Sequence, residues 1–401
     1  MVKNLEYRIL QIFLVLILFS QVSNVAAAEA PAEQWNRSFG GDDKDNSRCV
    51  EQTSDGGYVI AGTTDSYGKG SDGQSDAWLI KLDKNGSIEW NKTYGETYAE
   101  WGFLTKQTSD GGYVLSGYTF PHGYNQSYLV KTDKDGNEIW SKISEEISHE
   151  DYLQYVAERT SDGGYIIGDT VEYEIPDYDK YELFIDTDLR LTKYDINGNQ
   201  QWNNTFGDKN NSEMLDSWSY PVRQTPDGGY IIAGTIDSNK TIFFEANSFD
   251  FDIWLIKIDE SGQEQWNKTF GGQMDDSAFS ISTTSDNGYV LTGMYNDSWS
   301  FGVNGSAFIL KTDSEGNQEW IKEFTNCTLY SVQQTSDGGY IAAGVKNGNA
   351  WLVKLAGVGE GADYEDGKGI EHEDTSEGSF SLIKDYIYDA FPWVFPVKPL
   401  K

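Results

Sequence analysis

Short apolar runs recur along this chain, and a turn rich in glycine and aspartate precedes or follows each of them. The run Tyr58–Gly62 follows the turn Ser54–Gly57, and the turn Asp83–Gly86 joins Trp78–Leu82 to Ile88–Tyr94. Serine and aspartate side chains accept hydrogen bonds from the backbone of such turns, and glycine supplies the positive φ that the turns need. The pattern therefore predicts tight antiparallel hairpins.

The hairpin sequence Gln-Thr-Ser-Asp-Gly-Gly-Tyr-Val-Ile-Ala-Gly is repeated along the chain. Its copies are Gln52–Gly62, Gln107–Gly117, Arg159–Asp169, Gln224–Gly234, Thr283–Gly293 and Gln334–Gly344. The Asp-X-X-Gly turn recurs with it, at Asp83–Gly86, Asp133–Gly136, Asp195–Gly198, Asp259–Gly262 and Asp313–Gly316. Each repeat unit thus predicts four strands, called A to D in chain order. A sheet of four strands cannot bury both faces alone, but sheets that stack radially bury each other, as in a β-propeller.

The two ends of the repeat array predict how the ring closes. The sixth unit has no strand D after Leu355, whereas Gln34–Gly41 matches the strand D segment Gln265–Gly272 almost residue for residue. Counting it, each unit has one strand D tryptophan: Trp35, Trp90, Trp140, Trp202, Trp266 and Trp320. The sequence therefore predicts an all-β, six-bladed β-propeller of four-stranded antiparallel blades over residues 34–356, closed by the N-terminal strand. An open solenoid is the alternative, and it would leave Trp35 unpaired.

Several of these motifs resemble known propeller repeats. The spacing Asp83-X-X-Gly86-X-X-X-Trp90, followed by Gly95, resembles the tryptophan-docking repeat of pyrroloquinoline-quinone-type propellers. The Thr-Ser-Asp-Gly-Gly-Tyr hairpin is similar to the Asp-box turn of sialidase-like propellers, although its ending differs. The whole unit, over about Gln34–Leu355, most resembles the Asp-Gly-Gly-Tyr propeller repeats of archaeal and bacterial cell-surface proteins. The resemblance implies a fold and a cell-surface setting but no activity, because one scaffold carries unrelated chemistries.

The segments outside the repeat predict export. Residues 1–28 are a predicted signal peptide, with Lys3 and Arg8 at its start, the apolar stretch Ile9–Phe19 and small residues at Ala26–Ala28. An uncleaved membrane anchor is the alternative. Residues 357–378 are a predicted flexible acidic linker. Residues 379–401 are an apolar tail, which we expect to contact the propeller, a partner or a membrane. We expect a secreted protein at the extracellular cell surface.

The charge of the chain narrows the expected partners. A net charge of -34 and a pI of about 4.2 argue against nucleic acid and anionic membrane surfaces. The expected partners are surface glycans or other envelope proteins, and the chain is expected to be a monomer. Candidate N-glycosylation acceptors of the Asn-X-Ser/Thr type are dense. They are Asn36, Asn85, Asn91, Asn125, Asn203, Asn239, Asn267, Asn296, Asn304 and Asn326.

Residues with catalytic or metal-binding chemistry are sparse. The histidines His122, His149 and His372 are too dispersed for a metal cluster, and the chain lacks the adjacent cysteine pair usual for quinone binding. The Asp-X-X-Gly turns lack the ligand set of a calcium loop. No catalytic residue and no cofactor is therefore assigned, and calcium is left open. We predict a binding or adhesion module, with an extracellular glycan-processing or lactone-hydrolysing enzyme as the alternative.

The loops between strands B and C and between strands D and A share one face, and their variable lengths predict a ligand site there. The largest insertions are Thr170–Asp188 and Asp237–Asp250. The predicted ligand-binding residues are Tyr173, Tyr178, Tyr181, Phe184, Asp186, Phe243, Phe244 and Glu245. The alternative is that these insertions fold over each other as a satellite cluster.

The only cysteines, Cys49 and Cys327, lie in strand A of units that neighbour each other in a closed ring. Because export favours oxidation, we expect a disulfide between them. Two free buried thiols are the alternative.

Overall fold

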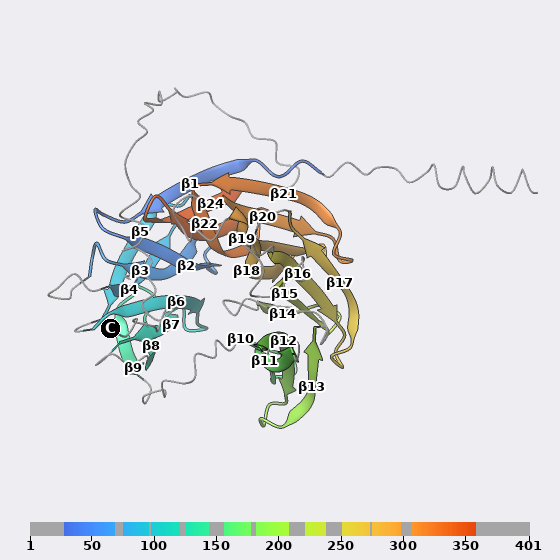
Figure 1. Cartoon of the computed structure of the whole chain (residues 1–401). Coiled ribbons are helices and arrows are strands. Elements are labelled where there is room, and N and C mark those ends of the chain that lie inside the picture. Colours follow the sequence, from blue (N-terminus) through green and yellow to red (C-terminus); the bar gives the residue numbers. More distant parts are fainter. Residues whose placement is uncertain are drawn as a thin grey trace, which may run out of the picture.

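The structure is a computed structural model that describes residues 28–68, 75–95, 98–120, 126–143, 156–177, 182–207, 221–237, 251–272, 275–297 and 306–357. These residues form six four-stranded antiparallel sheets. Figure 1 shows the sheets as blades around one axis, with strand A of each blade innermost and strand D at the rim. The prediction of a six-bladed β-propeller is confirmed.

The strands follow the repeat in chain order. Blade 1 contains β2 (Asp45–Gln52), β3 (Tyr58–Thr64), β4 (Asp76–Leu82) and β5 (Ile88–Tyr94). Blade 2 contains β6 (Glu100–Gln107), β7 (Tyr113–Thr119), β8 (Gln126–Thr132) and β9 (Glu138–Ile143). Blade 3 contains β10 (Val156–Arg159), β11 (Tyr165–Asp177), β12 (Glu182–Tyr194) and β13 (Gln200–Phe206). Blade 4 contains β14 (Val222–Gln224), β15 (Tyr230–Asp237), β16 (Phe251–Ile258) and β17 (Glu264–Phe270). Blade 5 contains β18 (Asp275–Thr283), β19 (Tyr289–Asp297), β20 (Ser306–Thr312) and β21 (Gln318–Thr325). Blade 6 contains β22 (Cys327–Gln334), β23 (Tyr340–Lys346), β24 (Asn349–Leu355) and, as its outer strand, β1 (Glu33–Phe39).

The N-terminal strand closes the last blade, as predicted. Strand β1 pairs antiparallel with β24, with Asn36 opposite Val353. Beyond the pairing, the Ala356 N–H donates to the Ala32 carbonyl at 2.8 Å. The side chain of Trp35 packs against the buried cluster that joins blades 6 and 1. The first and last parts of the repeat array therefore share one sheet.

Neighbouring blades are joined by the tryptophans of their outer strands. The Trp35 ring meets the Tyr58 ring edge-on at 5.8 Å, and a Cβ added at Gly86 would lie 3.0 Å from Trp35. Four further pairs repeat this contact: Trp90–Tyr113, Trp202–Tyr230, Trp266–Tyr289 and Trp320–Tyr340. A tryptophan thus docks on the next blade at five of the six junctions.

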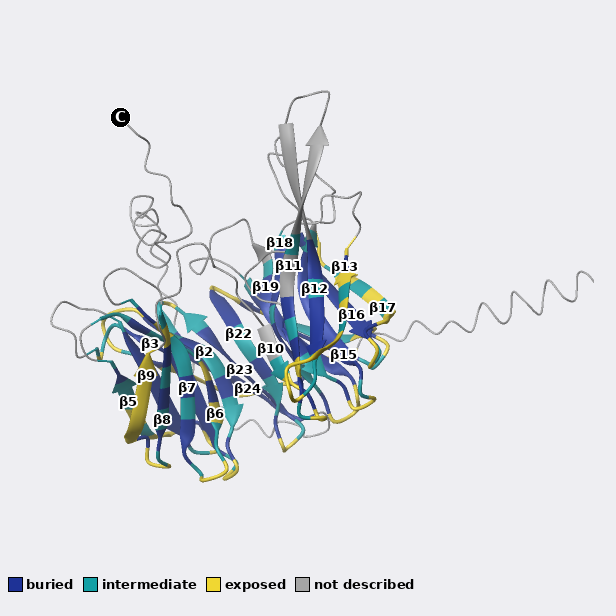
Figure 2. Cartoon of the chain, turned by 90° about the horizontal axis from the view of Figure 1, so that it is seen from below, coloured by how far each residue is buried: buried dark blue, intermediate teal, exposed yellow. Residues whose placement is uncertain are grey.

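The junction between blades 2 and 3 differs from the other five. Trp140 and Tyr165 hold the equivalent positions, but they are 38% and 45% exposed and make no ring contact with each other. Strand β3 is buried throughout, whereas along β7 Tyr113 and Leu115 are buried and the intervening Val114 is not. Strand β9 is exposed along its whole length (yellow in Figure 2). The face that blade 2 turns toward blade 3 is therefore open to solvent.

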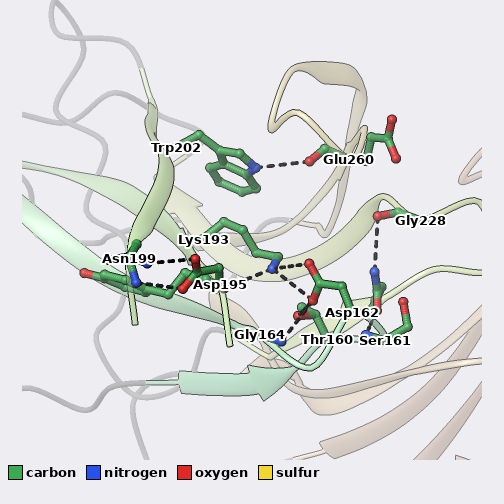
Figure 3. Close-up of polar contacts among 12 residues, drawn as sticks. Thr160, Ser161, Asp162, Gly164, Lys193, Asp195, Asn199, Trp202, Gly228 and Glu260 are labelled. Carbon is green, nitrogen blue, oxygen red and sulfur yellow. Dashed lines mark hydrogen bonds and ion pairs between the residues drawn. The ribbon is translucent and has the colours of Figure 1, made fainter. Parts of the chain in front are cut away.

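An ion pair between an exposed aspartate and a lysine with little exposed surface holds the A–B hairpin of every blade. The Asp55 carboxylate accepts a hydrogen bond from the Gly57 N–H at 2.9 Å and lies 3.0 Å from the Lys81 ammonium of strand C. We call this arrangement the hairpin clamp, and Figure 3 shows its blade 3 copy around Lys193. The remaining copies are Asp110–Lys131, Asp162–Lys193, Asp227–Lys257, Asp286–Lys311 and Asp337–Lys354, each with an N–O distance of 2.9 Å. The lysine in strand C is a partner that the sequence reasoning missed.

The predicted disulfide is wrong, because Cys49 and Cys327 are both free. Successive side chains of a strand point to opposite faces of its sheet. Val50 therefore packs at the junction with blade 6, whereas the Cys49 sulfur turns toward blade 2, 3.9 Å from the Thr105 carbonyl oxygen. Cys327 packs against blade 5. The two thiols point away from the junction that was expected to hold the bridge, and burial raises the pKa of each.

The predicted loop Thr170–Asp188 is also different in the structure. Strands β11 and β12 continue through most of it, with Thr170 opposite Leu189 and Asp177 opposite Glu182. A long hairpin therefore stands where a variable loop was expected.

Candidate functional site

The innermost strands of four blades carry a β-bulge at the same place in the repeat. The register of β2 shifts between Ser47 and Cys49, so that Arg48 is the extra residue. Phe103 in β6, Phe279 in β18 and Tyr330 in β22 are the extra residues of the equivalent bulges. Each lies seven positions before the clamp aspartate of its own blade. A bulge changes the direction of a side chain, so these four residues form a set.

The last glycine of the hairpin repeat makes room for each of these bulges. A Cβ at Gly62 would overlap the Asn46 carbonyl oxygen, and a Cβ at Gly344 would overlap that of Thr328. Gly117 and Gly293 lie in the same way against strand A carbonyls. The bulged backbone of strand A thus occupies the space that any larger residue in strand B would need. The repeat glycine and the bulge therefore depend on each other.

The four bulged side chains meet around the propeller axis. The Arg48 guanidinium lies 4.0 Å from the centre of the Tyr330 ring and 6.0 Å from that of Phe103. The Phe279 ring stacks on Tyr330 at 5.6 Å with an interplanar angle of 28°. All four side chains are half-buried. We call Arg48, Phe103, Phe279 and Tyr330 the axial collar.

The same spacing places two further aromatic residues in the set. Counting seven positions back from the clamp aspartates of blades 3 and 4 gives Tyr155 and Tyr220. Both lie outside the described residues. The repeat therefore provides one arginine and five aromatic residues at equivalent positions, and this offset is the sequence signal that could have identified the collar.

Arg48 contacts aromatic rings and no anion. A guanidinium carries five N–H donors in a planar fork. Among the described residues, none accepts a hydrogen bond from Arg48 or forms an ion pair with it. Cation–π attraction to two rings holds the group in place while its donors stay available. The collar can therefore receive a carboxylate in a bidentate, charge-assisted contact.

Two ion pairs join the innermost strands of neighbouring blades. Lys106 lies 3.5 Å from Glu51, and Arg223 lies 3.5 Å from Glu158. Such partly exposed pairs contribute little free energy, but they neutralise each other. Arg48 is the charged side chain of the collar, and no described residue neutralises it.

The predicted ligand-binding residues lie elsewhere, and their side chains are not among those described. Tyr173 and Asp186 face each other in the backbone register of β11 and β12, and Phe184 pairs with Ile175. Tyr178, Tyr181, Phe243, Phe244 and Glu245 lie outside the described residues. The loop-face site therefore remains a prediction.

The candidate glycosylation residues are exposed wherever their side chains are described. Asn36, Asn91, Asn203 and Asn267 lie on outer strands, while Asn85 and Asn326 lie in turns. Asn125, Asn239 and Asn304 fall outside the described residues, as does the side chain of Asn296.

Few groups among the described residues indicate a metal site or another kind of binding site. They contain no group of three or more histidine, cysteine or carboxylate side chains placed to hold a metal, so calcium stays untested. The Asp83 carboxylate accepts hydrogen bonds from the N–H groups of Asn85 and Ser87 at 2.8 Å, which gives that turn a structural role. Arg37 lies on an outermost strand, whereas Arg48, Arg159 and Arg223 lie on the innermost strands of blades 1, 3 and 4. The part of the chain that is described holds no helix able to cross a membrane.

Comparison with known proteins gives likenesses in solved structures alone. No protein-family model matches the chain, and no curated protein matches it. A sialidase from Streptococcus pneumoniae is similar with a TM-score of 0.48 and 9% identity, over 84% of this chain and 72% of that one. A DUF4221-family protein from Bacteroides vulgatus has a TM-score of 0.42 and 10% identity, over 82% and 97%. Drosophila Plexin A, in complex with Semaphorin 1b, has a TM-score of 0.41 and 8% identity, over 82% and 88%. These likenesses carry no argument about activity, and the fold stands on the strand topology.

Proposed function

We propose that this protein is an exported cell-surface binding module whose axial collar takes a ligand that combines a carboxylate with a ring, such as an acidic sugar. The observation that carries the proposal is the Arg48 guanidinium, held between the rings of Tyr330 and Phe103 without an anionic partner among the described residues. The carboxylate would meet the guanidinium. The apolar face of the sugar ring would pack on the neighbouring aromatic rings.

The strongly acidic chain does not prevent this contact. At physiological salt the field of an exposed charge falls off over about 8 Å, so distant carboxylates are largely screened. On the innermost strands, Glu51 and Glu158 are each paired with a base. Arg48 has no such partner among the described residues.

Binding is favoured over catalysis by what surrounds the arginine. Sugar-cleaving enzymes use two carboxylates on either side of the scissile bond. Among the described residues, the groups in contact with Arg48 are two aromatic rings, which supply neither an acid nor a base. A glycan-processing enzyme remains the alternative for the loop face predicted from the sequence. Export, a cell-surface location and glycan or envelope-protein partners belong to this proposal, on the evidence of the N-terminal segment and the resemblance.

An array of neutral and acidic glycans, probed with and without calcium, tests the proposal. The test variant is Arg48→Gln, and the matched control is Arg37→Gln. Arg37 also lies over an aromatic ring, 5.6 Å from the centre of Trp35, but on the outermost strand. We expect the parent to bind glycans that carry a carboxylate, Arg48→Gln to lose at least tenfold in affinity, and Arg37→Gln to bind as the parent. Equal binding by the two variants would place the site elsewhere.

A further inference from the structure

The junction between blades 2 and 3 lacks a hydrogen bond that links neighbouring blades at four other junctions. At four junctions the glutamine that ends strand A of one blade accepts a hydrogen bond from the hairpin of the preceding blade. These bonds run from Ser54 to Gln107, Ser161 to Gln224, Ser285 to Gln334 and Ser336 to Gln52, at 2.7–2.8 Å. In blade 3 the position belongs to Arg159, whose guanidinium cannot accept a hydrogen bond.

The end of the outer strand of blade 2 also differs from the repeat sequence of the other blades. Four of the other five outer strands end in an aromatic residue followed by glycine, at Phe39-Gly40, Tyr94-Gly95, Phe206-Gly207 and Phe270-Gly271, and the fifth has Phe324 followed by Thr325. Blade 2 has Ser144 and Glu145 there. A Cβ added at Gly198 of blade 3 would meet nothing within 4 Å, whereas at Gly86 or Gly316 it would meet the docked tryptophan. Sequence and structure thus agree that this junction is built differently.

The open junction concentrates exposed apolar surface. Seven of the nine large apolar side chains that are exposed in the described residues belong to blades 2 and 3: Leu104, Tyr118, Ile139, Trp140, Ile143, Tyr165 and Ile196. Trp140 and Tyr165 lie where the other junctions have their docked pair. Because successive side chains of a strand point to opposite faces, Ile139 and Ile143 lie on the other face of β9 from Trp140. We call the exposed apolar side chains that remain, Leu104, Tyr118, Trp140, Tyr165 and Ile196, the seam. Exposed apolar side chains gathered at one junction mark a docking site, because water is a poor solvent for them.

We propose that the seam is the docking site of the chain's own apolar tail, residues 379–401. Within that tail the large apolar residues are Phe380, Leu382, Ile383, Ile387, Phe391, Trp393, Val394 and Phe395. Tethering raises the effective concentration of a segment to the millimolar range, which favours it over a free partner or a second copy.

The acidic linker, residues 357–378, has the length and charge to deliver the tail. Its 22 residues span up to about 70 Å when extended. A compact propeller of this size measures about 50 Å across. The linker starts at blade 6, where a Cβ at Gly357 would lie 2.9 Å from the Asp337 carbonyl oxygen. Lys142 and Arg159 are exposed on the two sides of the seam, and their positive charges complement the carboxylates of the linker.

Hydrogen exchange on the full chain tests the docking. The tail variant carries Phe391→Ser, Trp393→Ser and Phe395→Ser, and the matched control carries Tyr364→Ser in the linker. We expect the tail variant to exchange several-fold faster in the strands of the seam, β6, β7, β9 and β11, with the other blades and the control unchanged. Adding Trp140→Ser to the tail variant should then cause no further change in these strands.

Three results would overturn the proposal. The first is seam strands that exchange equally fast in the parent and the tail variant. The second is protection of the seam that rises with protein concentration alongside dimer formation, which would make a second copy the occupant. The third is binding of the tail to anionic lipid vesicles while exchange at the seam stays unaltered, which would make it a membrane contact.

Discussion

The hairpin clamps and the axial collar use equivalent positions of one repeat in opposite ways. All six blades keep the same aspartate and lysine in the clamp, at N–O distances of 2.9–3.0 Å. The collar keeps the same backbone bulge but varies the side chain, with an arginine in blade 1 and aromatic residues in the others described. Positions that repeat without change serve the fold, because each blade faces the same packing problem. A position that changes on an unchanged backbone is free to serve a ligand.

The largest effect should come from breaking a clamp that has a single carboxylate. Lys354 is 2% exposed and pairs with Asp337 alone, whereas Lys311 pairs with both Asp286 and Glu319. The Asp337 carboxylate is partly exposed, but removing it leaves the buried Lys354 ammonium with the Leu355 carbonyl oxygen as its remaining partner, which costs about 3 kcal/mol. We expect Asp337→Ala to lower the free energy of unfolding by about 3 kcal/mol and Asp286→Ala by about 1 kcal/mol. Urea unfolding measures both, and equal losses would contradict the clamp account.

Replacing the glycine beside a bulge should affect both the stability of the blade and ligand binding by the collar. A Cβ at Gly344 would overlap the Thr328 carbonyl oxygen, so Gly344→Ala must shift strand A, where Tyr330 lies. Overpacking of this kind costs about 2 kcal/mol. We expect Gly344→Ala to lose both stability and glycan binding, as measured by urea unfolding and the glycan array. Gly338→Ala, in the hairpin turn, is a control with open space around the new Cβ, although its φ of +79° adds some strain. Unchanged binding in Gly344→Ala would show that the bulge does not position the collar.

Acid should weaken the clamps. Desolvation raises the pKa of Asp55, but hydrogen bonds from Thr53, the Gly57 N–H and Lys81 outweigh it and lower that pKa to about 2. The ordinary value is near 3.9. Because the folded pKa is depressed, this stabilisation is present above about pH 4 and is lost as the pH falls toward 2. We expect the urea midpoint to fall over this range, and to fall less in Asp55→Asn. An equally steep fall in both proteins would contradict the role of Asp55.

The smallest effect on stability should come from the collar itself. Arg48 is half-buried and its described contacts are cation–π contacts, which are worth about 1 kcal/mol or less at such sites. We expect Arg48→Gln to change the free energy of unfolding by no more than that in a urea titration. A loss comparable to that of Asp337→Ala would mean that the arginine holds the ring together.

The sequence predicted the parts of the fold that depend on local chemistry. The turns of each unit and the pairing of Gln34–Gly41 with the last blade follow from turn residues and repeated motifs. The prediction of a disulfide failed because a repeat identifies the strand that holds Cys49 but not the face of the sheet to which its side chain points. A step of one residue, from Val50 to Cys49, moves a side chain to the opposite junction.

The collar and the clamp lysines needed the structure for a different reason. The residues of the collar stand at a constant offset in the sequence, but only the bulge shows that this position turns toward the axis. Lys81 lies within an apolar strand, on the same face as Ala77 and Leu79, so its position gives no sign that it pairs with a charge. Its partner Asp55 is distant in sequence, and only the sheet brings the two together.

The separation of the ligand site from the clamps can be measured with one acidic glycan, by its binding and the free energy of unfolding in the parent, Arg48→Gln and Asp337→Ala. We expect Arg48→Gln to lose at least tenfold in binding at nearly full stability. We expect Asp337→Ala to lose about 3 kcal/mol of stability and, at temperatures where it is folded, to bind as the parent. Binding that follows stability in both variants, or that survives in Arg48→Gln, would show that the collar is not the ligand site.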